Sequence, residues 1–221
     1  DTPDLPNLYG EAFEQRYEAY EREGKAMKQV PARALYARMM QVLAETGNGW
    51  ICFKDKANLR SAQTAKAGNV IHSSNLCTEI LEVTSADQTA VCNLGSLNLS
   101  SFVSNREFDF DKLRKITATA VKFLDRVVDL NYYPTPEAKA SNQKWRPIGL
   151  GIMGLQDALF KMRLPFTSPE AKKVSARISE TVYHQALMTS MELAQKDGPF
   201  PNFKDSRYAD AQLQVQLADE L

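Results

Sequence analysis

Apolar residues recur along much of the chain at the three- and four-residue intervals of an amphipathic helix. This spacing predicts four long helices, over residues 9 to 23, 32 to 45, 109 to 130 and 169 to 197. Ser168 is the expected N-cap of the last helix, and Gly198 is expected to stop it. The positions expected to face inward are Phe13, Tyr17, Tyr20, Leu35, Met39, Val42, Leu43, Leu113, Ile116, Ala120, Phe123, Val127, Val174, Ile178, Val182 and Leu193.

Other apolar stretches have the length and turn boundaries of strands. They are "WICF" (residues 50 to 53, expected to be buried), "NLCTEILEV" (75 to 83), "QTAVCNLGSLNL" (88 to 99) and "PIGLGIMGL" (147 to 155). A polar loop is expected over residues 54 to 69, and a polar tail from about 201. The last strand runs into the helical segment "LQDALFKM". This alternation of strands and helices predicts an α/β fold, with too few strands for a closed sheet.

The charge and cysteine content indicate which partners, cellular environment and metal sites to expect for this protein. The 221 residues carry 27 basic and 27 acidic side chains, and no apolar run has the length of a membrane span. We therefore expect neither a nucleic-acid nor a membrane partner. The cysteines, Cys52, Cys77 and Cys92, are few and odd in number, which indicates a reducing, cytoplasmic environment. Their spacing fits no zinc motif and His72 and His184 add no ligand pair, so no metal site is expected.

The stretch "NLCTEILEV" holds three candidate catalytic side chains at alternating positions, Asn75, Cys77 and Glu79. On a strand they share one face, spaced over roughly 13 Å. Glu79 could take a proton, Asn75 could hold a hydroxyl, and Cys77 could do covalent or radical chemistry. The alternative is a buried, unreactive Cys77 between two solvent-facing neighbours. A hydrolytic cysteine–histidine pair would need His72 or His184 as its base.

Gly149, Gly151 and Gly154 fit the dinucleotide pattern GxGxxG, with Glu170 at the acidic position. The residues before them, "KWRP", do not form a buried first strand. We interpret the glycines as allowing close packing of strand on helix, with a nicotinamide-dependent oxidoreductase as an alternative. Elsewhere in the sequence, two consecutive tyrosines, Tyr132 and Tyr133, are interpreted as part of an aromatic core.

Four ordered motifs together resemble the large subunit of class I ribonucleotide reductases. They are "SNLCTEI", "AVCNLGSLNL" with Cys92 fifteen residues after Cys77, "NYYPTPEA" and "RPIGLGIMGLQDALF". The resemblance extends from about residue 5 to about residue 200. It implies that residues 1–221 form one incomplete segment of a ten-stranded catalytic α/β barrel. Because the first residue is Asp1, we expect a processed product or a segment of a longer chain.

The resemblance also implies a role for each candidate residue. Cys77 matches the thiyl radical that abstracts the 3′ hydrogen of a ribonucleoside diphosphate. Glu79 matches the base that takes the 3′-hydroxyl proton, and Asn75 matches the amide that binds the ribose hydroxyls. Cys92 matches one thiol of the redox-active disulfide, with its partner outside this chain. Cys52 has no counterpart and is interpreted as a small buried hydrophobe.

The resemblance also implies the partners of the protein. The radical comes from a metal-containing small (beta) subunit, and thioredoxin or glutaredoxin is the external reductant of this allosteric enzyme of deoxyribonucleotide synthesis. No cofactor is expected in this chain. The family's ATP-binding region, second redox cysteine, substrate-phosphate loop, radical-transfer tyrosines and C-terminal cysteine pair are not found in the sequence. The competing hypothesis is an inactive, reductase-like fragment that acts only by association with other large-subunit segments or protomers, or with itself.

Overall fold

The computed structural model describes residues 2–213, which form two compact units. The first unit holds the residues up to Ala90 together with those from Lys204 onward, and the second holds Val91–Phe203. The two units are described separately. That residues 1–221 are one segment of a single barrel domain stays a prediction, and its last eight residues, 214–221, lie outside the described part.

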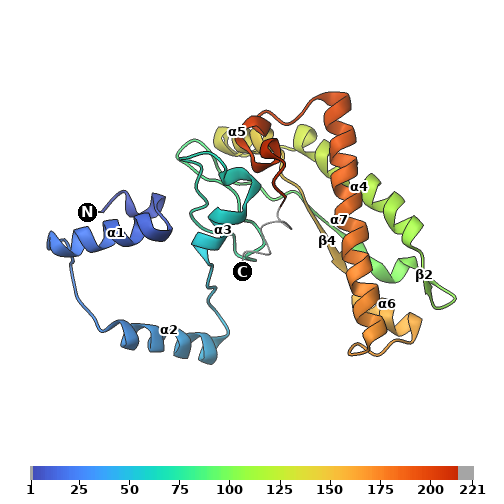
Figure 1. Ribbon diagram of the computed structural model, residues 1–221, viewed down its shortest axis with the longest axis horizontal. Coiled ribbons are helices and arrows are strands. Elements are labelled where there is room, and N and C mark those ends of the chain that lie inside the picture. The colour runs from blue at the N-terminus through green and yellow to red at the C-terminus, as the bar shows by residue number, and fades with distance from the viewer. Residues whose placement is uncertain (1, 214–221) are drawn as a thin grey trace. The chain divides into compact units, whose positions relative to one another are not determined.

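The first unit is helical and irregular (Figure 1). It contains α1 (Gly10–Arg22), α2 (Ala32–Thr46) and α3 (Lys54–Arg60), with short 3-10 turns at Leu5–Asn7, Ala62–Thr64 and Arg207–Asp210. A further 3-10 turn, Phe203–Asp205, begins at the last residue of the second unit. The two helices expected here are confirmed. The polar loop expected from residue 54 begins instead with α3, and "WICF" is irregular rather than a strand, with Trp50, Ile51 and Phe53 exposed.

The inward face expected for the first two helices is largely exposed. Tyr20 is buried, but Phe13 and Tyr17 of the same stripe are not. No residue of α2 is buried, and its expected inward residues Leu35 and Met39 are about half exposed. An apolar stripe shows which face of a helix is suited to burial, but it does not show whether another element packs against that face.

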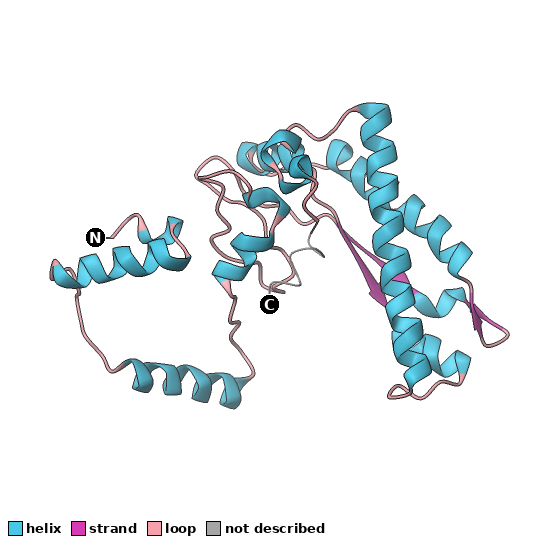
Figure 2. Ribbon diagram, in the orientation of Figure 1, coloured by secondary structure: helices cyan, strands magenta, loops and turns pink. Residues whose placement is uncertain are grey.

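The second unit is built around one pair of parallel strands, β1 (Leu94–Asn98) and β4 (Gly149–Met153), shown as crossing arrows in Figure 2. In their register Leu94 lies opposite Gly149. A parallel pair requires a long crossover, and the intervening chain supplies one. The remaining elements are η3 (Leu99–Phe102), the hairpin strands β2 (Val103–Ser104) and β3 (Glu107–Phe108), and the helices α4 (Phe110–Leu130), α5 (Pro136–Trp145), α6 (Leu155–Met162) and α7 (Pro169–Asp197).

Helix boundaries in this unit follow the capping signals. The Ser168 hydroxyl accepts a hydrogen bond from Ala171 N at 3.1 Å, and α7 ends at Gly198, as predicted. Asp109 caps α4 by accepting from Lys112 N at 2.8 Å. The α/β class is confirmed, although no closed barrel is present within residues 2–213.

The core of the second unit confirms only part of the expected face of α4, since Leu113 is buried and Ala120 packs against the core cluster. Ile116, Phe123 and Val127 were expected inside but are exposed. The buried stripe is Leu113, Thr117, Val121, Leu124 and Val128. Both stripes are apolar, so the period alone cannot choose between them. Packing makes the choice, since an added Cβ at Gly95 of β1 would lie 3.5 Å from Leu124 Cδ1. The core cluster comprises Leu97, Leu99, Phe102, Phe108, Leu113, Ala158, Ile178 and Val182.

Among the described residues, no helix is long and apolar enough to cross a lipid bilayer. The same residues contain no group of three or more side chains that could together hold a metal ion.

Candidate functional site

The candidate catalytic residues lie on a loop whose two ends are joined in the first unit. Val70 O accepts a hydrogen bond from Thr84 N at 3.2 Å, which closes the loop at its base. Val70, Ile71 and Val83 are buried around this closure. Burial of these apolar side chains anchors the loop, so residues 72 to 82 project from a fixed stem.

Side-chain amides hold this stem in place of a neighbouring strand. Asn58 is fully buried; its Oδ1 accepts from Ile71 N at 2.8 Å, and its Nδ2 donates to Ile71 O at 2.9 Å. On the other side of the stem, Val83 N donates to Gln63 Oε1 at 2.8 Å. Both amides come from the segment expected to be a polar loop. They satisfy backbone groups that a strand would otherwise pair with.

The tip of the loop is a turn, which corrects the expectation of an extended strand. Thr78 N donates to Asn75 O at 3.1 Å, so Leu76 and Cys77 are the central residues of the turn. Thr78 has φ +66°, a strained conformation for a β-branched residue. The Asn75 side chain explains the turn, because its Oδ1 accepts from Ile80 N at 3.1 Å and so competes with strand pairing.

The turn nevertheless brings the predicted amide and carboxylate together. Asn75 Nδ2 donates to Glu79 Oε1 at 2.7 Å, across the turn that carries Cys77. Cys77 and Glu79 are exposed and Asn75 is half-buried. The reading of Cys77 as an ordinary buried cysteine is therefore wrong. A thiol, a carboxylate and an amide within one turn can address neighbouring atoms of one small substrate.

Sequence reasoning missed a contact from Trp50 to this turn. The indole N–H of Trp50 donates to the carbonyl of Leu76, the peptide group that joins Leu76 to Cys77. Trp50 was expected in a buried strand, where its indole would have no role in the loop. Cys52 follows in the same irregular segment and is exposed, which contradicts its interpretation as a buried hydrophobe.

His72 supports the stem of the loop rather than the thiol. Its Nδ1 lies 2.8 Å from Thr84 Oγ1, and its Nε2 lies 2.8 Å from Asn7 Oδ1. Burial, followed by the nearby charge of Lys54, lowers the pKa of His72 and favours the neutral ring. Both ring nitrogens are engaged by these partners, so His72 is poorly placed to act as a base for Cys77.

Cys92 and the glycine motif belong to the second unit. Cys92 is exposed and stands two residues before the start of β1. Gly149 and Gly151 face β1, where added Cβ atoms would lie 2.5 Å from Leu94 Cδ2 and 3.4 Å from Ser96 Oγ. These two glycines therefore permit a close approach of strand to strand, rather than the expected packing of strand on helix.

Gly154 has a different role, because it begins α6 with φ +72°, a conformation that favours glycine. The expected aromatic core at Tyr132-Tyr133 is half wrong. Tyr132 is exposed, whereas Tyr133 is half-buried and its hydroxyl donates to Val128 O at 2.6 Å.

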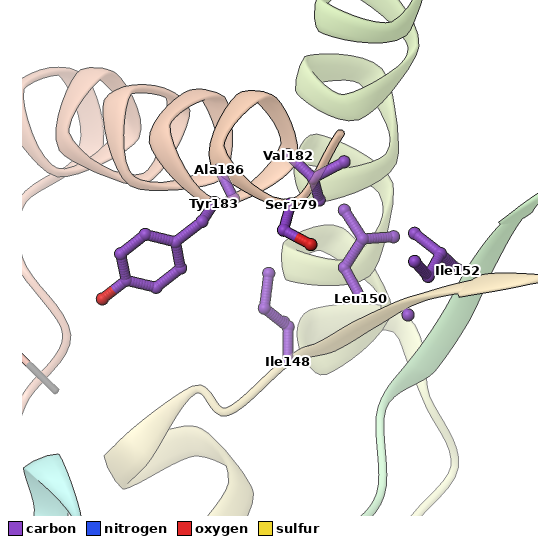
Figure 3. Close-up of a pocket in the computed structure, with 8 residues that line it drawn as sticks. Ile148, Leu150, Ile152, Ser179, Val182, Tyr183 and Ala186 are labelled. Carbon is purple, nitrogen blue, oxygen red and sulfur yellow. The ribbon is translucent and has the colours of Figure 1, made fainter. Parts of the chain in front are cut away.

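A cavity of about 330 Å³ lies between β4 and α7 in the second unit. Figure 3 shows the aliphatic side chains of Ile148 and Leu150 facing Val182 and the hydroxyl of Ser179, with Tyr183 at one side. None of its lining residues carries a charge or a thiol. The cavity thus offers apolar contact but no acid, base or nucleophile comparable to the loop.

Known proteins similar to this chain share one description. A sequence profile described as "Ribonucleotide reductase, barrel domain" matches residues 1–220. The chain is 43% identical over 219 residues to the ribonucleoside-diphosphate reductase large chain of Neurospora crassa, and 44% identical over 219 residues to the large subunit of Trypanosoma brucei brucei. It is 43% identical over 213 residues to the ribonucleoside-diphosphate reductase subunit alpha of Chlamydia pneumoniae.

These alignments cover 98%, 99% and 94% of this chain, respectively, but only 23%, 26% and 20% of the relatives. The chain therefore spans about a quarter of the length of the relatives it matches. The match of the profile to nearly every residue, together with these identities, places the chain in the ribonucleotide reductase barrel-domain family.

Proposed function

We propose that this chain supplies the catalytic loop of a ribonucleoside-diphosphate reductase, which converts ribonucleoside diphosphates to deoxyribonucleoside diphosphates in the cytoplasm. The observation that carries the proposal is the single turn that presents Asn75, Cys77 and Glu79. The profile match over residues 1–220 supports it. In this proposal the loop lies within a ten-stranded α/β barrel that is completed by further segments of the large subunit.

Each side chain of the turn has a distinct task in the proposed reaction. Cys77, as a thiyl radical, abstracts the 3′ hydrogen, which is feasible because the S–H and sugar C–H bonds are of similar strength. Glu79 accepts the 3′-hydroxyl proton while the 2′-hydroxyl leaves as water. Asn75 binds the ribose hydroxyls without adding charge near the radical. The hydrogen bond between Asn75 and Glu79 holds the amide and the carboxylate together before substrate arrives.

Two further thiols complete the reaction. Cys92 and a cysteine outside this chain supply the reducing electrons and become a disulfide, which thioredoxin or glutaredoxin then reduces. A separate small subunit, which contains a metal, supplies the radical. The groups that this chain contributes are therefore the radical thiol, the base, the binding amide and one reducing thiol.

The decisive experiment replaces the thiols one at a time in the complete large subunit, assayed with its small subunit and external reductant. We expect Cys77→Ser to abolish turnover, because an alcohol O–H is too strong to form the radical. Cys52→Ser is the matched control, since Cys52 is an exposed cysteine of the same unit. Full multi-turnover activity in the Cys77→Ser protein would falsify the assignment.

A second candidate function is association without catalysis. Within the described residues β1 and β4 pair only with each other, so each leaves a strand edge unpaired. Such edges favour pairing with other large-subunit segments or with another copy of the chain. The mass of the native polypeptide, measured with an antibody against this segment, separates the two hypotheses. A mass several times 24.8 kDa supports the complete reductase, and a mass near 24.8 kDa supports a separate associating piece.

A further inference from the structure

Cys92 stands directly before a pair of buried side-chain amides, Asn93 and Asn142. Asn93 is 4% exposed and Asn142 is completely buried, although asparagine is usually found at the surface. Asn93 Nδ2 donates to Asn142 Oδ1 at 2.6 Å, and Asn142 Nδ2 lies 3.4 Å from Asn93 Oδ1. The two amides thus face each other as a reciprocal pair across 49 residues of sequence.

Asn93 also makes hydrogen bonds to the backbone of the segment that leads into β4. Its Nδ2 also donates to Pro147 O at 2.9 Å, and its carbonyl accepts from Gly149 N at 2.9 Å. The second of these bonds extends the pairing of β1 with β4 by one residue. Asn93 is therefore held both by its side chain and by its main chain.

The other half of the pair is anchored in the helices. Asn142 belongs to α5, and its Nδ2 also donates to the hydroxyl of Tyr133. That hydroxyl donates in turn to Val128 O of α4 at 2.6 Å. Polar groups this deeply buried are costly to leave unpaired, so the whole chain of hydrogen bonds resists displacement of any one member.

This anchoring sets the direction of the neighbouring thiol. Adjacent side chains of an extended segment point to opposite faces. Burial follows this rule here: Cys92 is exposed, Asn93 buried, Leu94 exposed, Gly95 half-buried and Ser96 exposed. With Asn93 locked inward, Cys92 is directed outward.

We propose that the Asn93–Asn142 pair positions the Cys92 thiol for disulfide formation during substrate reduction, an inference that rests on the proposed function. In that step Cys92 and a second thiol give two electrons and two protons. The ribose 2′-hydroxyl leaves as water, a hydrogen replaces it on carbon, and an S–S bond forms. Disulfide geometry tolerates little error, since the two Cα atoms must lie about 4.4 to 6.8 Å apart. Loosening Cys92 should therefore slow reduction without slowing the hydrogen abstraction that precedes it.

The test uses the complete large subunit with its small subunit, in a single turnover without external reductant. Two quantities are measured: the deoxynucleotide formed, and the substrate-dependent loss of the small-subunit radical by electron paramagnetic resonance. We expect Asn142→Leu to lower the amount of deoxynucleotide formed by roughly tenfold to a hundredfold, because a displacement of a reacting group by about 1 Å can have an effect of this size. Substrate-dependent radical loss should rise above that of the unsubstituted protein, because hydrogen abstraction still occurs but the radical returns to the small subunit only after the substrate has been reduced.

Ser141→Ala is the matched control, because it removes a buried hydroxyl at the adjacent position of α5. It should leave both quantities unchanged. If Asn142→Leu does not fold, Asn93→Asp keeps the shape of the pair but removes both donations from Asn93, and the same selective loss is expected. A folded variant that forms less product without a rise in substrate-dependent radical loss, or that loses no product, overturns the inference.

Failure of the proposed function gives a different result. In that case the unsubstituted subunit forms no deoxynucleotide, and Cys92→Ser therefore does not change the amount of product. If only the positioning inference fails, the unsubstituted protein is active, Cys92→Ser loses product, and Asn142→Leu keeps it.

Discussion

Asn58 makes two hydrogen bonds to the backbone of Ile71, as the neighbouring residue of a β-ladder would. A side chain can do this at one position only, so the stem of the loop is held at separate points, by Asn58 at Ile71 and by Gln63 at Val83, rather than along a strand. The position of the turn at Cys77 therefore depends on two amide side chains, and the contribution of the buried one, Asn58, can be tested.

We expect Asn58→Ala to lower the free energy of unfolding by about 3 kcal/mol, because it leaves the N–H and C=O of Ile71 buried without partners. Urea unfolding gives the size of the effect, and hydrogen exchange at the Ile71 amide gives its location. Asn69→Ala is the control: Asn69 is half-buried and donates one bond, to Gln63 O at 3.1 Å, so a loss of about 1 kcal/mol is expected. Equal effects of the two substitutions would contradict this account of the stem.

His72 should make the stability of the first unit depend on pH. Burial and Lys54 lower its pKa in the folded state, so the unfolded chain binds a proton more readily. Stability should therefore fall as pH drops below the ordinary histidine pKa of about 6.5, and level off below the lowered pKa. Urea midpoints measured between about pH 7.5 and 5 should show this slope, and His72→Gln should flatten it. An unchanged slope in the variant would assign the effect to another group.

At the scale of elements, the long helices were predicted well because their period and caps are local, whereas the short helices α3 and α5 were not predicted. Ser168 and Gly198 are visible in the sequence, and they begin and end α7 as expected. The buried face of α4 was not predictable, since its two apolar stripes differ only in what packs on them. The turn at Cys77 was missed for a related reason. Its stem depends on Asn58 and Gln63, which lie 13 and 20 residues away from their backbone partners.

The packing of α5 on α4 depends on Arg146. Arg146 Nη1 lies 2.7 Å from Asp129 Oδ1, and Nε lies 2.9 Å from Asp125 Oδ1. Its hydrogen bond lowers the pKa of Asp129. We expect Arg146→Ala to lower the free energy of unfolding by about 2 kcal/mol, because its side chain is only 22% exposed. Thermal or urea unfolding measures this loss.

Arg126 provides the control, since it reaches the same Asp129 at 3.6 Å from a largely exposed position. Replacing Arg126 by alanine should cost less than about 0.5 kcal/mol, as for most surface ion pairs. Comparable losses for Arg126→Ala and Arg146→Ala would show that the contribution of Arg146 is general charge and not its buried hydrogen bonds.

At the scale of the whole molecule, the two strand edges of the β1–β4 pair bear on how the isolated chain behaves. Ile152 of β4 is 43% exposed beside one of these edges. We expect the isolated chain to self-associate, and Ile152→Lys to weaken that association because a charged edge disfavours pairing. Sedimentation velocity over a concentration series measures the self-association of both proteins.

Leu130→Lys is the matched control, because it places the same charge at an exposed apolar position of a helix. If association proceeds through the strand edges, Leu130→Lys should have the smaller effect. A larger effect at Leu130 would assign association to the helical surface instead.

The turn at Cys77 is closed largely by its own residues. The Ser74 hydroxyl donates to Ile80 O at 2.7 Å, the Asn75 side chain accepts from Ile80 N, and Thr78 N closes onto Asn75 O. The stem residues Val70 and Thr84 are joined by a single backbone bond. A synthetic peptide cyclised between these two positions should therefore present an amide, a thiol and a carboxylate in one loop.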